Sequence, residues 1–395
     1  MDEALIADSK FVELKIPRQT RVILIILLFI AFLLVYFFWV KKDMTDFGVC
    51  YQGGKRILEG ETLYRVSDGH LQYKYSPPSA IFFSLFSLLS YEIAKLIWYL
   101  SELIFLYLIL ILSYKLLPSK LKKKGAIIVF SLLILAKFYA REIELGQVNI
   151  FIILILVLML VAVLEKKDVL AGLLWGLTLF FKPYALVFLP YFLLKKRFKL
   201  TITGIVVIIL GLMSPVIFYG FKGNIIVLKD WFTTLSQSTS PLLASFDNAS
   251  IHSFFLNVFP AQKTKLALAF IMGVILVVTL SFLGMMFLGK KKGLKKPEVL
   301  EFSFLFILIP FLSPLGWYYN YLYSILAVVF LLNDLEKFPL LLKYGLIVNF
   351  IIIAGSLREI LGQEVFHFYT RYSLVVLNYL IVLFYLFYAR IRKYA

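Results

Sequence analysis

The chain has 395 residues, of which 62% are hydrophobic and only 16% charged, and its mean hydropathy is +0.91. Soluble domains carry about a quarter charged residues, so this composition excludes an ordinary soluble protein and predicts a polytopic membrane protein. The net charge of +18 comes mainly from lysine and arginine in short loops between apolar runs. That distribution indicates cytoplasmic loops and not a nucleic-acid partner. The single cysteine, Cys50, excludes an intrachain disulfide and a cysteine-cluster metal site.

The first apolar run, residues 21–40, is long enough to cross about 30 Å of hydrocarbon as a helix. It follows a charged segment, residues 1–20, which we expect to be a cytoplasmic tail. The run is too long for the apolar core of a signal peptide, and no small-residue cleavage site follows it. We therefore expect it to be a retained membrane span.

The segment 41–91 is polar, dense in turn-forming residues, and expected to be the first outer loop. Thr45 is predicted to cap a short amphipathic helix that reaches about Gly54. Further on, Pro77 and Pro78 indicate the start of a second helix, because proline is tolerated in a first helical turn.

The apolar piece 79–90 is short for a membrane span, whereas 92–117 is full length and leads into a lysine-rich segment. If that segment is cytoplasmic, residues 79–90 do not cross the membrane. We interpret them as a re-entrant or juxtamembrane helix. A short crossing, which would place the lysines outside, remains the alternative.

Residues 169–194 are interrupted by Lys182 and Pro183, because proline removes a helix hydrogen bond and a lysine within the membrane is costly. Two short helices that meet at an outer turn would solve both problems. The segment 220–262 is expected to be a long outer loop. Further spans are predicted at 125–140, 147–164, 200–219, 264–288, 299–313, 317–332, 339–356 and 371–389.

These elements predict a single all-α transmembrane domain over residues 1–395, with about twelve spans and both termini in the cytoplasm. We expect it to lie in the plasma membrane, with its chemistry on the extracytoplasmic face. The inner loops contain mostly lysine. The polar and aromatic residues expected on the outer side are Asp46, Lys74, Arg141, Glu142, Glu144, Gln147, Asn149, Lys182, Asn248, His252, Trp317, Asn320 and Arg358.

Several of these residues also have simple structural interpretations. Asp46 can be a capping or solvated residue, and Glu142 and Glu144 can both be ion-pair partners of Arg141. Lys182 can extend to the interface, although ionisable residues inside a membrane usually have a function. No cluster has metal-ligand spacing, and no phosphate-binding glycine loop or nucleophile elbow is present. We therefore expect no metal and no cofactor.

One carboxylate, several cations and an apolar wall suit a lipid-linked sugar donor. Transfer from a polyprenyl phosphate requires a base that removes the acceptor hydroxyl proton and cations that stabilise the departing phosphate. An inverting transferase needs one such carboxylate. Asp46 fits the base. Lys182, Arg141 or Lys74 fit the phosphate, and the candidates for sugar or acceptor contacts are Gln147, Asn149, Asn248, His252, Trp317 and Asn320.

Six different short motifs occur one after another within residues 22–332. They are Asp46-Phe47, Gly60…Leu63-Tyr64, Tyr75-Ser76-Pro77-Pro78, Gly146-Gln147-Val148-Asn149, Ala171-Gly172…Gly176-Leu177…Phe181-Lys182-Pro183 and Leu312-Ser313-Pro314…Trp317. In this pattern the chain resembles the polyprenyl-phosphate-mannose-dependent mannosyltransferases of the GT-C superfamily, of the glycosyltransferase family 87 type. The resemblance implies a GT-C-like helical bundle in which Asp46 is the catalytic base. It also implies mannose or a related sugar taken from a polyprenyl phosphate on the outer face, without a required metal, and passed to a lipid or glycan acceptor.

The sequence departs from the family at one motif, where Trp317 is followed by Tyr318-Tyr319-Asn320 and the family often has histidine. Asp43 remains an alternative base. The competing functions are a secondary transporter, which would usually show internal repeats, and a flippase or polymerase of lipid-linked oligosaccharides, which would bind lipid phosphate without depending on Asp46.

Overall fold

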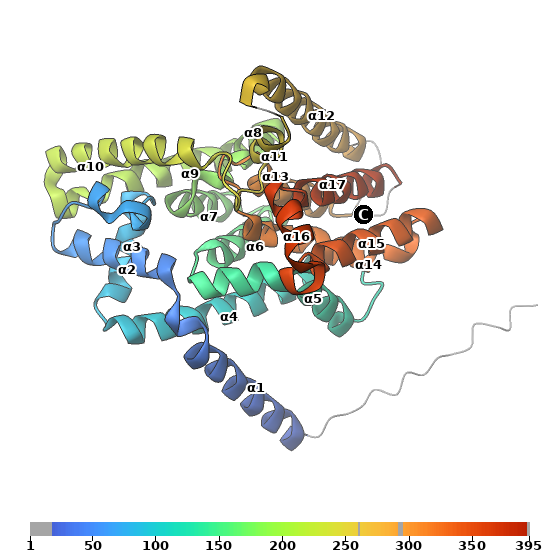
Figure 1. Cartoon of the computed structure of the whole chain (residues 1–395), viewed down its shortest axis with the longest axis horizontal. Coiled ribbons are helices and arrows are strands. Elements are labelled where there is room, and N and C mark those ends of the chain that lie inside the picture. Colours follow the sequence, from blue (N-terminus) through green and yellow to red (C-terminus); the bar gives the residue numbers. More distant parts are fainter. Residues whose placement is uncertain (1–17, 260, 291–294, 393–395) are drawn as a thin grey trace, which may run out of the picture. The chain divides into compact units, whose positions relative to one another are not determined.

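The computed structural model describes residues 18–259, 261–290 and 295–392, and their regular elements are all helices (Figure 1). The only β-pairing among them is an isolated bridge between Asn248 and Trp317. The expected all-α fold is therefore confirmed, whereas most of the predicted tail, 1–20, lies outside the described residues.

The chain divides into two compact units, Met1–Asp43 and Met44–Ala395. The described part of the first unit consists of helix α1, Arg18–Phe38, and a short 3-10 helix, Val40–Lys42. Helix α1 coincides closely with the first predicted span. Asp43, the last residue of this unit, is exposed.

The second unit begins with α2, Thr45–Leu58, which is four residues longer than predicted. Thr45 lies inside this helix, so the prediction that it is the cap is wrong. The capping position belongs to Met44, whose φ of 37° places it in the left-handed region. Helix α3, Pro77–Ser87, starts at Pro77 as predicted and is followed by α4, Tyr91–Leu116.

Helices α5, Lys124–Leu145, and α6, Asn149–Leu164, form a pair bent by 118°. Residues 141–145, which lie beyond the predicted span 125–140, complete the end of α5. The change of direction begins at Gly146, which caps α5 with φ +64°, a conformation that glycine adopts readily.

The predicted interruption at Lys182-Pro183 is confirmed. Helix α7 ends at Phe181, a 3-10 helix follows, and α8 completes the segment; their bounds are Asp168–Phe181, Pro183–Val187 and Phe188–Leu194. Helix α9, Phe198–Met213, ends six residues before the predicted 200–219 span does, and α10, Val216–Thr239, leaves at 94°. Pro215 lies at this bend, where its missing N–H interrupts helical bonding.

Helices α12 to α15 and α17 match the predicted apolar segments. Much of 220–262, which was expected to be a long outer loop, is helical in α10 and α11, and the sequence did not reveal these helices or α16. Helices α6, α13 and α14 are buried along most of their length, as expected of helices that are apolar all round. The bounds are α11 Ile251–Val258, α12 Thr264–Lys290, α13 Pro297–Leu312, a 3-10 helix Tyr318–Ser324, α14 Ile325–Asn333, α15 Leu340–Gly355, α16 Arg358–Arg371 and α17 Val375–Ile391.

Within the described residues, two helices are individually long and apolar enough to cross a membrane, and three bent pairs raise this to as many as five. Shorter apolar helices, such as α7 and α17, add to the set. These features agree with a polytopic membrane protein. The count of about twelve spans and the placement of α3 relative to the membrane stay predictions.

The start of α2 is packed against the turn between α5 and α6. The backbone N–H of Met44 donates to the carbonyl of Glu144 at 2.8 Å. Phe47 is fully buried and stacks on Trp98, with ring centroids 5.7 Å apart. Gly146 lies against Phe47, because a Cβ built on Gly146 would be 2.7 Å from Cβ of Phe47.

We predict that Gly146→Ala destabilises the protein by about 2–4 kcal/mol, because it combines a strained left-handed conformation with an overlap against Phe47. The measurement is the thermal unfolding midpoint of the protein in detergent. Gly125→Ala is the matched control, since Gly125 lies in α5 with nothing within 4 Å of its added Cβ. Equal midpoints for the two variants would contradict the packing described above.

Candidate functional site

Asp46 contacts Gln147 where α2 meets the α5–α6 turn. Asp46 lies in the first turn of α2, and Gln147 Nε2 donates to its Oδ2 at 2.5 Å. The same nitrogen lies 3.4 Å from the hydroxyl of Tyr319. Among the described residues, no side chain donates to Oδ1 of Asp46, so this oxygen is open to a ligand.

Lys182 lies between two side-chain amides. Its Nζ donates to Oε1 of Gln147 and to Oδ1 of Asn149, both at 3.0 Å. The Oε1 atom of Gln147 also accepts from the hydroxyl of Tyr75 at 3.2 Å. The lysine backbone is extended at the end of α7, which directs the side chain away from the helix. An ammonium has three N–H groups, so one remains for a ligand.

Asn149 continues the chain of contacts into the protein. Its Nδ2 donates to Oε2 of Glu142 at 2.9 Å and to Oδ1 of Asn320 at 3.1 Å, and its Oδ1 accepts from the hydroxyl of Tyr323 at 3.3 Å. The side chains of Asn149, Glu142 and Asn320 are fully buried. The result is a continuous hydrogen-bonded series of five side chains: Asp46, Gln147, Lys182, Asn149 and Glu142.

Burial raises the pKa of Asp46 above its ordinary value. The hydrogen bond from Gln147 acts in the opposite direction and favours the charged form. Nearby cations also lower this pKa, in decreasing order Lys182, Arg141 and Lys74. Because burial dominates, Asp46 has a higher proton affinity than an exposed aspartate, as suits a side chain that accepts a proton.

Arg141 and Lys74 act on Asp46 through their charge, without a hydrogen bond to it. Arg141 forms an ion pair with Glu144 at 2.7 Å. The side chain of Lys74 is half-buried, and its carbonyl accepts from the indole N–H of Trp231 at 3.1 Å.

Three predicted contact residues lie outside this hydrogen-bonded series. Asn248 is buried and fastens a loop, with its Nδ2 2.8 Å from the carbonyl of Pro314 and its Oδ1 accepting from the N–H of Gly316 at 3.0 Å. Trp317 is the bridge partner of Asn248 and precedes the 3-10 helix that carries Asn320. His252 lies on α11, and burial lowers its pKa.

The sequence did not assign roles to four side chains of the series. The hydroxyls of Tyr75, Tyr319 and Tyr323 hold the two amides, and Glu142 holds Asn149 and not Arg141. A usable signal was present for two of them, since Tyr75 and Tyr319 belong to motifs already described, and Tyr323 follows Tyr319 by four residues.

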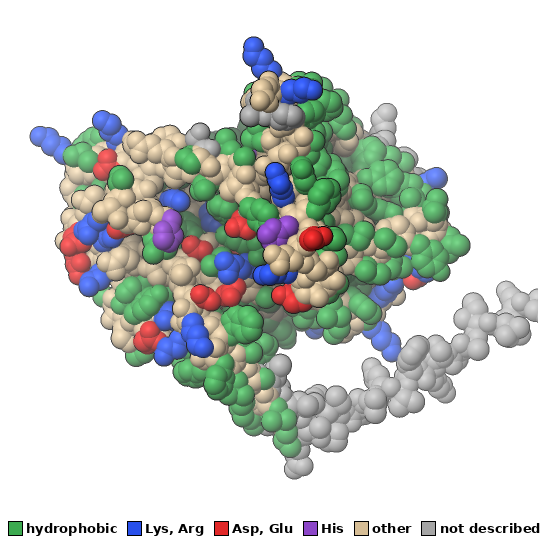
Figure 2. Space-filling model, in the orientation of Figure 1, with side chains coloured by type: hydrophobic (Ala, Val, Ile, Leu, Met, Phe, Trp, Pro, Cys, Tyr) green, Lys and Arg blue, Asp and Glu red, His purple; other side chains and the backbone are tan. Residues whose placement is uncertain are grey.

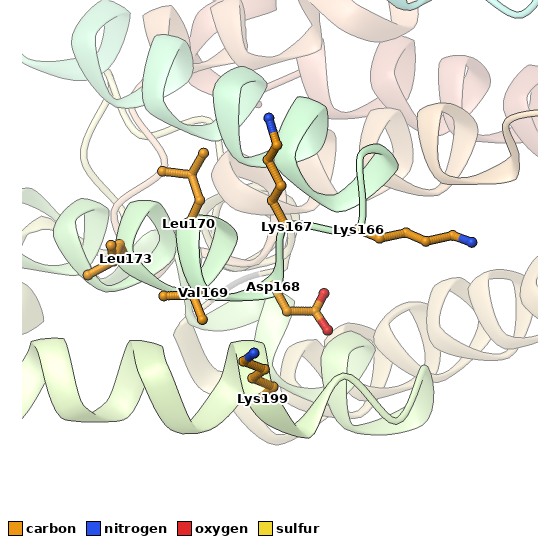
Figure 3. A pocket seen from close by; sticks show the side chains of 7 residues that line it. All are labelled: Lys166, Lys167, Asp168, Val169, Leu170, Leu173 and Lys199. Carbon is orange, nitrogen blue, oxygen red and sulfur yellow. The ribbon is translucent and has the colours of Figure 1, made fainter.

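A surface pocket of about 390 Å³ lies at the other end of α7, beside Asp168 and Lys199 (Figure 3). Its lysine side chains point in different directions, and Asp168 forms an ion pair with Arg197 at 2.8 Å. These groups do not converge on one ligand. Among the residues that the structure describes, no group of three histidine, cysteine, aspartate or glutamate side chains is placed to hold a metal ion.

Figure 2 shows acidic and basic side chains gathered in the middle of one face, over α6 and α16, among extensive hydrophobic surface.

The family model that matches this chain is glycosyltransferase family 87, over residues 73–314, more than half of the sequence. The chain belongs to glycosyltransferase family 87. It is therefore a membrane glycosyltransferase. No curated protein and no solved structure matches it.

The matched residues of this family 87 glycosyltransferase include Gln147, Asn149 and Lys182. Asp46 and Asn320 lie outside the match and join the same series of contacts through Gln147 and Asn149. The family therefore establishes the class of reaction, while the case for Asp46 rests on its contacts, its burial and its open oxygen.

We predict that Lys182→Met raises the pKa of Asp46 further, because it removes a positive charge that lowers this pKa. The measurement is the infrared carboxyl band of purified protein as a function of pH, with the Asp46→Asn spectrum subtracted. Lys182→Arg keeps the charge and is the control, expected to titrate close to the wild type. An unchanged titration in Lys182→Met would show that the ammonium does not act on Asp46.

Proposed function

We propose that this glycosyltransferase transfers a hexose, mannose in the first instance, from a polyprenyl-phosphate donor to a hydroxyl group of a lipid or glycan acceptor. Asp46 removes the hydroxyl proton, the acceptor oxygen attacks the anomeric carbon, and the lipid phosphate departs, so the anomeric configuration inverts. The observation that carries the proposal is the pairing of a half-buried carboxylate with a lysine through one amide, Gln147.

Asp46 has the properties of a general base for this reaction. Its Oδ2 is fixed by Gln147, and Oδ1 is open to an incoming hydroxyl. Its raised pKa strengthens it as a proton acceptor, and the charge of Lys182 nevertheless favours the ionised form that catalysis requires.

Lys182 and an apolar cavity together fit the donor. The cavity, of about 310 Å³, lies between α3, α6, α7 and α9, and its wall includes Phe82, Phe151 and Phe181. Lys182 directly follows Phe181 at the end of α7. A prenyl chain in the cavity would therefore present its phosphate to an ammonium, which stabilises the leaving group electrostatically.

Asn320 is suited to hold the sugar through its side-chain NH₂ group. The Nδ2 of Asn320 is buried, and among the described residues it has no hydrogen-bond acceptor. A buried donor without an acceptor is costly, and a sugar hydroxyl would satisfy it. Arg141 and Lys74 are the further candidates for the phosphate, with Gln147, Asn248, His252 and Trp317 as the remaining candidates for sugar or acceptor contacts.

The distribution of lysine supports a reaction on the extracytoplasmic face of the plasma membrane, with both termini in the cytoplasm. The lysine-rich loops, such as 120–124 and 195–197, lie at the ends of helices opposite the α5–α6 turn in the expected topology. A donor embedded in the membrane is consistent with this arrangement, since its sugar is presented at the bilayer surface.

We predict that Asp46→Asn lowers the rate of transfer by about 10²–10⁴-fold, the usual contribution of a general base. The assay uses purified protein with radiolabelled polyprenyl-phosphate mannose, and offers an alkyl mannoside or a lipid extract of native membranes as acceptor. Asp43→Asn is the matched control, because Asp43 is an exposed aspartate three positions earlier. A loss in the control and not in Asp46→Asn would assign the base to Asp43.

The same assay includes polyprenyl-phosphate glucose, polyprenyl-phosphate arabinose and a nucleotide-activated mannose. Transfer from another polyprenyl-phosphate sugar would correct the sugar and retain the donor class. Transfer from the nucleotide sugar alone would contradict the lipid-phosphate donor.

We predict that Lys182→Ala raises the KM for the polyprenyl-phosphate donor about tenfold, since it removes a charge-assisted contact to the phosphate. Initial rates at varied donor and saturating acceptor measure this constant. Lys182→Arg should retain most of the affinity. A normal rate with an unchanged donor KM in Lys182→Ala would exclude the phosphate role.

A further inference from the structure

Glu142 is buried at the inner end of the series that begins with Asp46. Its exposed fraction is 0%, and it lies in the last turn of α5. The neighbouring Glu144 forms the ion pair with Arg141, so Glu142 is not needed for that purpose. Its two carboxylate oxygens instead accept from the backbone and the side chain of Asn149, and the backbone N–H of Ile150 also acts on this carboxylate.

Both donors of Asn149 depend on this carboxylate. The backbone N–H of Asn149 lies 2.6 Å from Oε1 of Glu142, and the side-chain Nδ2 lies 2.9 Å from Oε2. The two donors lie on different oxygens, so each position of the side-chain terminus must be an acceptor. A carboxylate supplies both, whereas the amide of glutamine supplies one acceptor and one donor.

This contact determines which end of the Asn149 amide faces Lys182. With Nδ2 directed at Glu142 and Asn320, the Oδ1 atom must face the opposite side. There it accepts from Lys182 at 3.0 Å and from Tyr323 at 3.3 Å. If the amide were reversed, its NH₂ group would face an ammonium, which is also a donor.

Asp46 and Glu142 therefore act on Lys182 in parallel. Each carboxylate orients one amide, Gln147 or Asn149, and each amide presents its oxygen to the ammonium. They differ in access, because Asp46 is half-buried with an open oxygen, whereas Glu142 is fully enclosed with both oxygens occupied. Glu142 can hold the arrangement but cannot reach a substrate.

We propose that Glu142 is a positioning residue for donor binding: through Asn149 it directs the Lys182 ammonium toward the donor phosphate. This inference rests on the proposed function and adds a residue that acts without touching the substrate. Its loss should weaken donor binding and leave the base, Asp46, in place.

We predict that Glu142→Gln raises the donor KM about tenfold, because one of the two Asn149 donors then faces an NH₂ group and the amide reverses. The acceptor KM should be unchanged, whereas kcat should fall as well, because Lys182 also stabilises the departing phosphate. The measurements are initial rates at varied donor and acceptor, together with the thermal unfolding midpoint in detergent. A purely structural role would lower the midpoint without the selective change in donor KM.

Glu102→Gln is the matched control. Glu102 is also a fully buried glutamate, on α4, and neither of its oxygens has a hydrogen-bond partner among the described residues. The same chemical change at this position should leave both KM values unchanged.

Asn149→Leu tests the same link from the other side, and it carries the test if Glu142→Gln does not fold. Both single variants should raise the donor KM by a similar factor. The donor KM of the double variant should not exceed the higher of the two single-variant values, because both changes interrupt the same path from Glu142 through Asn149 to Lys182. The inference would be overturned if the two substitutions raised the donor KM by factors that multiply in the double variant. It would also be overturned if the donor KM did not change, or if the loss were confined to kcat. If the wild type transferred no sugar from any polyprenyl phosphate, the proposed function itself would fail, an outcome distinct from these.

Discussion

The contact between the first turn of α2 and the α5–α6 turn is the constraint on which the site depends. Helix α2 is short, and helices of this length are marginal alone, so tertiary packing must hold it. Phe47 provides this packing, since burying such a side chain contributes about 1.5–3 kcal/mol. Gly146 permits the approach, and Asp46, one residue before Phe47, is thereby placed against Gln147.

The polar series is surrounded by apolar helices, so its hydrogen bonds define its arrangement closely. An amide buried in such surroundings must direct its oxygen to a donor and its nitrogen to an acceptor, because an unmatched group is costly. Gln147 and Asn149 meet this requirement in one orientation only, given the positions of Lys182 and the two carboxylates. The ammonium is consequently fixed before any ligand binds, and preorganised charge of this kind is what stabilises a leaving group most effectively.

The sequence predicted where the polar residues emerge better than it predicted which of them touch. The break at Lys182-Pro183 follows from local chemistry, since proline cannot continue a helix. The choice between Glu142 and Glu144 as the partner of Arg141 did not follow, because the predicted span ended at residue 140. Once these residues are helical, the i,i+3 spacing favours Glu144 and turns Glu142 to another side. Helix α16 was missed because its polar sequence lacks an apolar period, and tertiary contacts such as Met44 with Glu144 have no signal in the sequence.

Three consecutive residues at the end of α7 combine the two properties that a lipid-phosphate donor requires. Phe181 forms part of the wall of the apolar cavity. Lys182 follows with an extended backbone, and its ammonium reaches the side-chain amides of Gln147 and Asn149. Pro183 prevents α7 from continuing. If the helix did continue, Lys182 would lie on its surface. The boundary between apolar and charged surroundings is thus set by the chain itself, at the point where the prenyl chain of a donor would end and its phosphate begin.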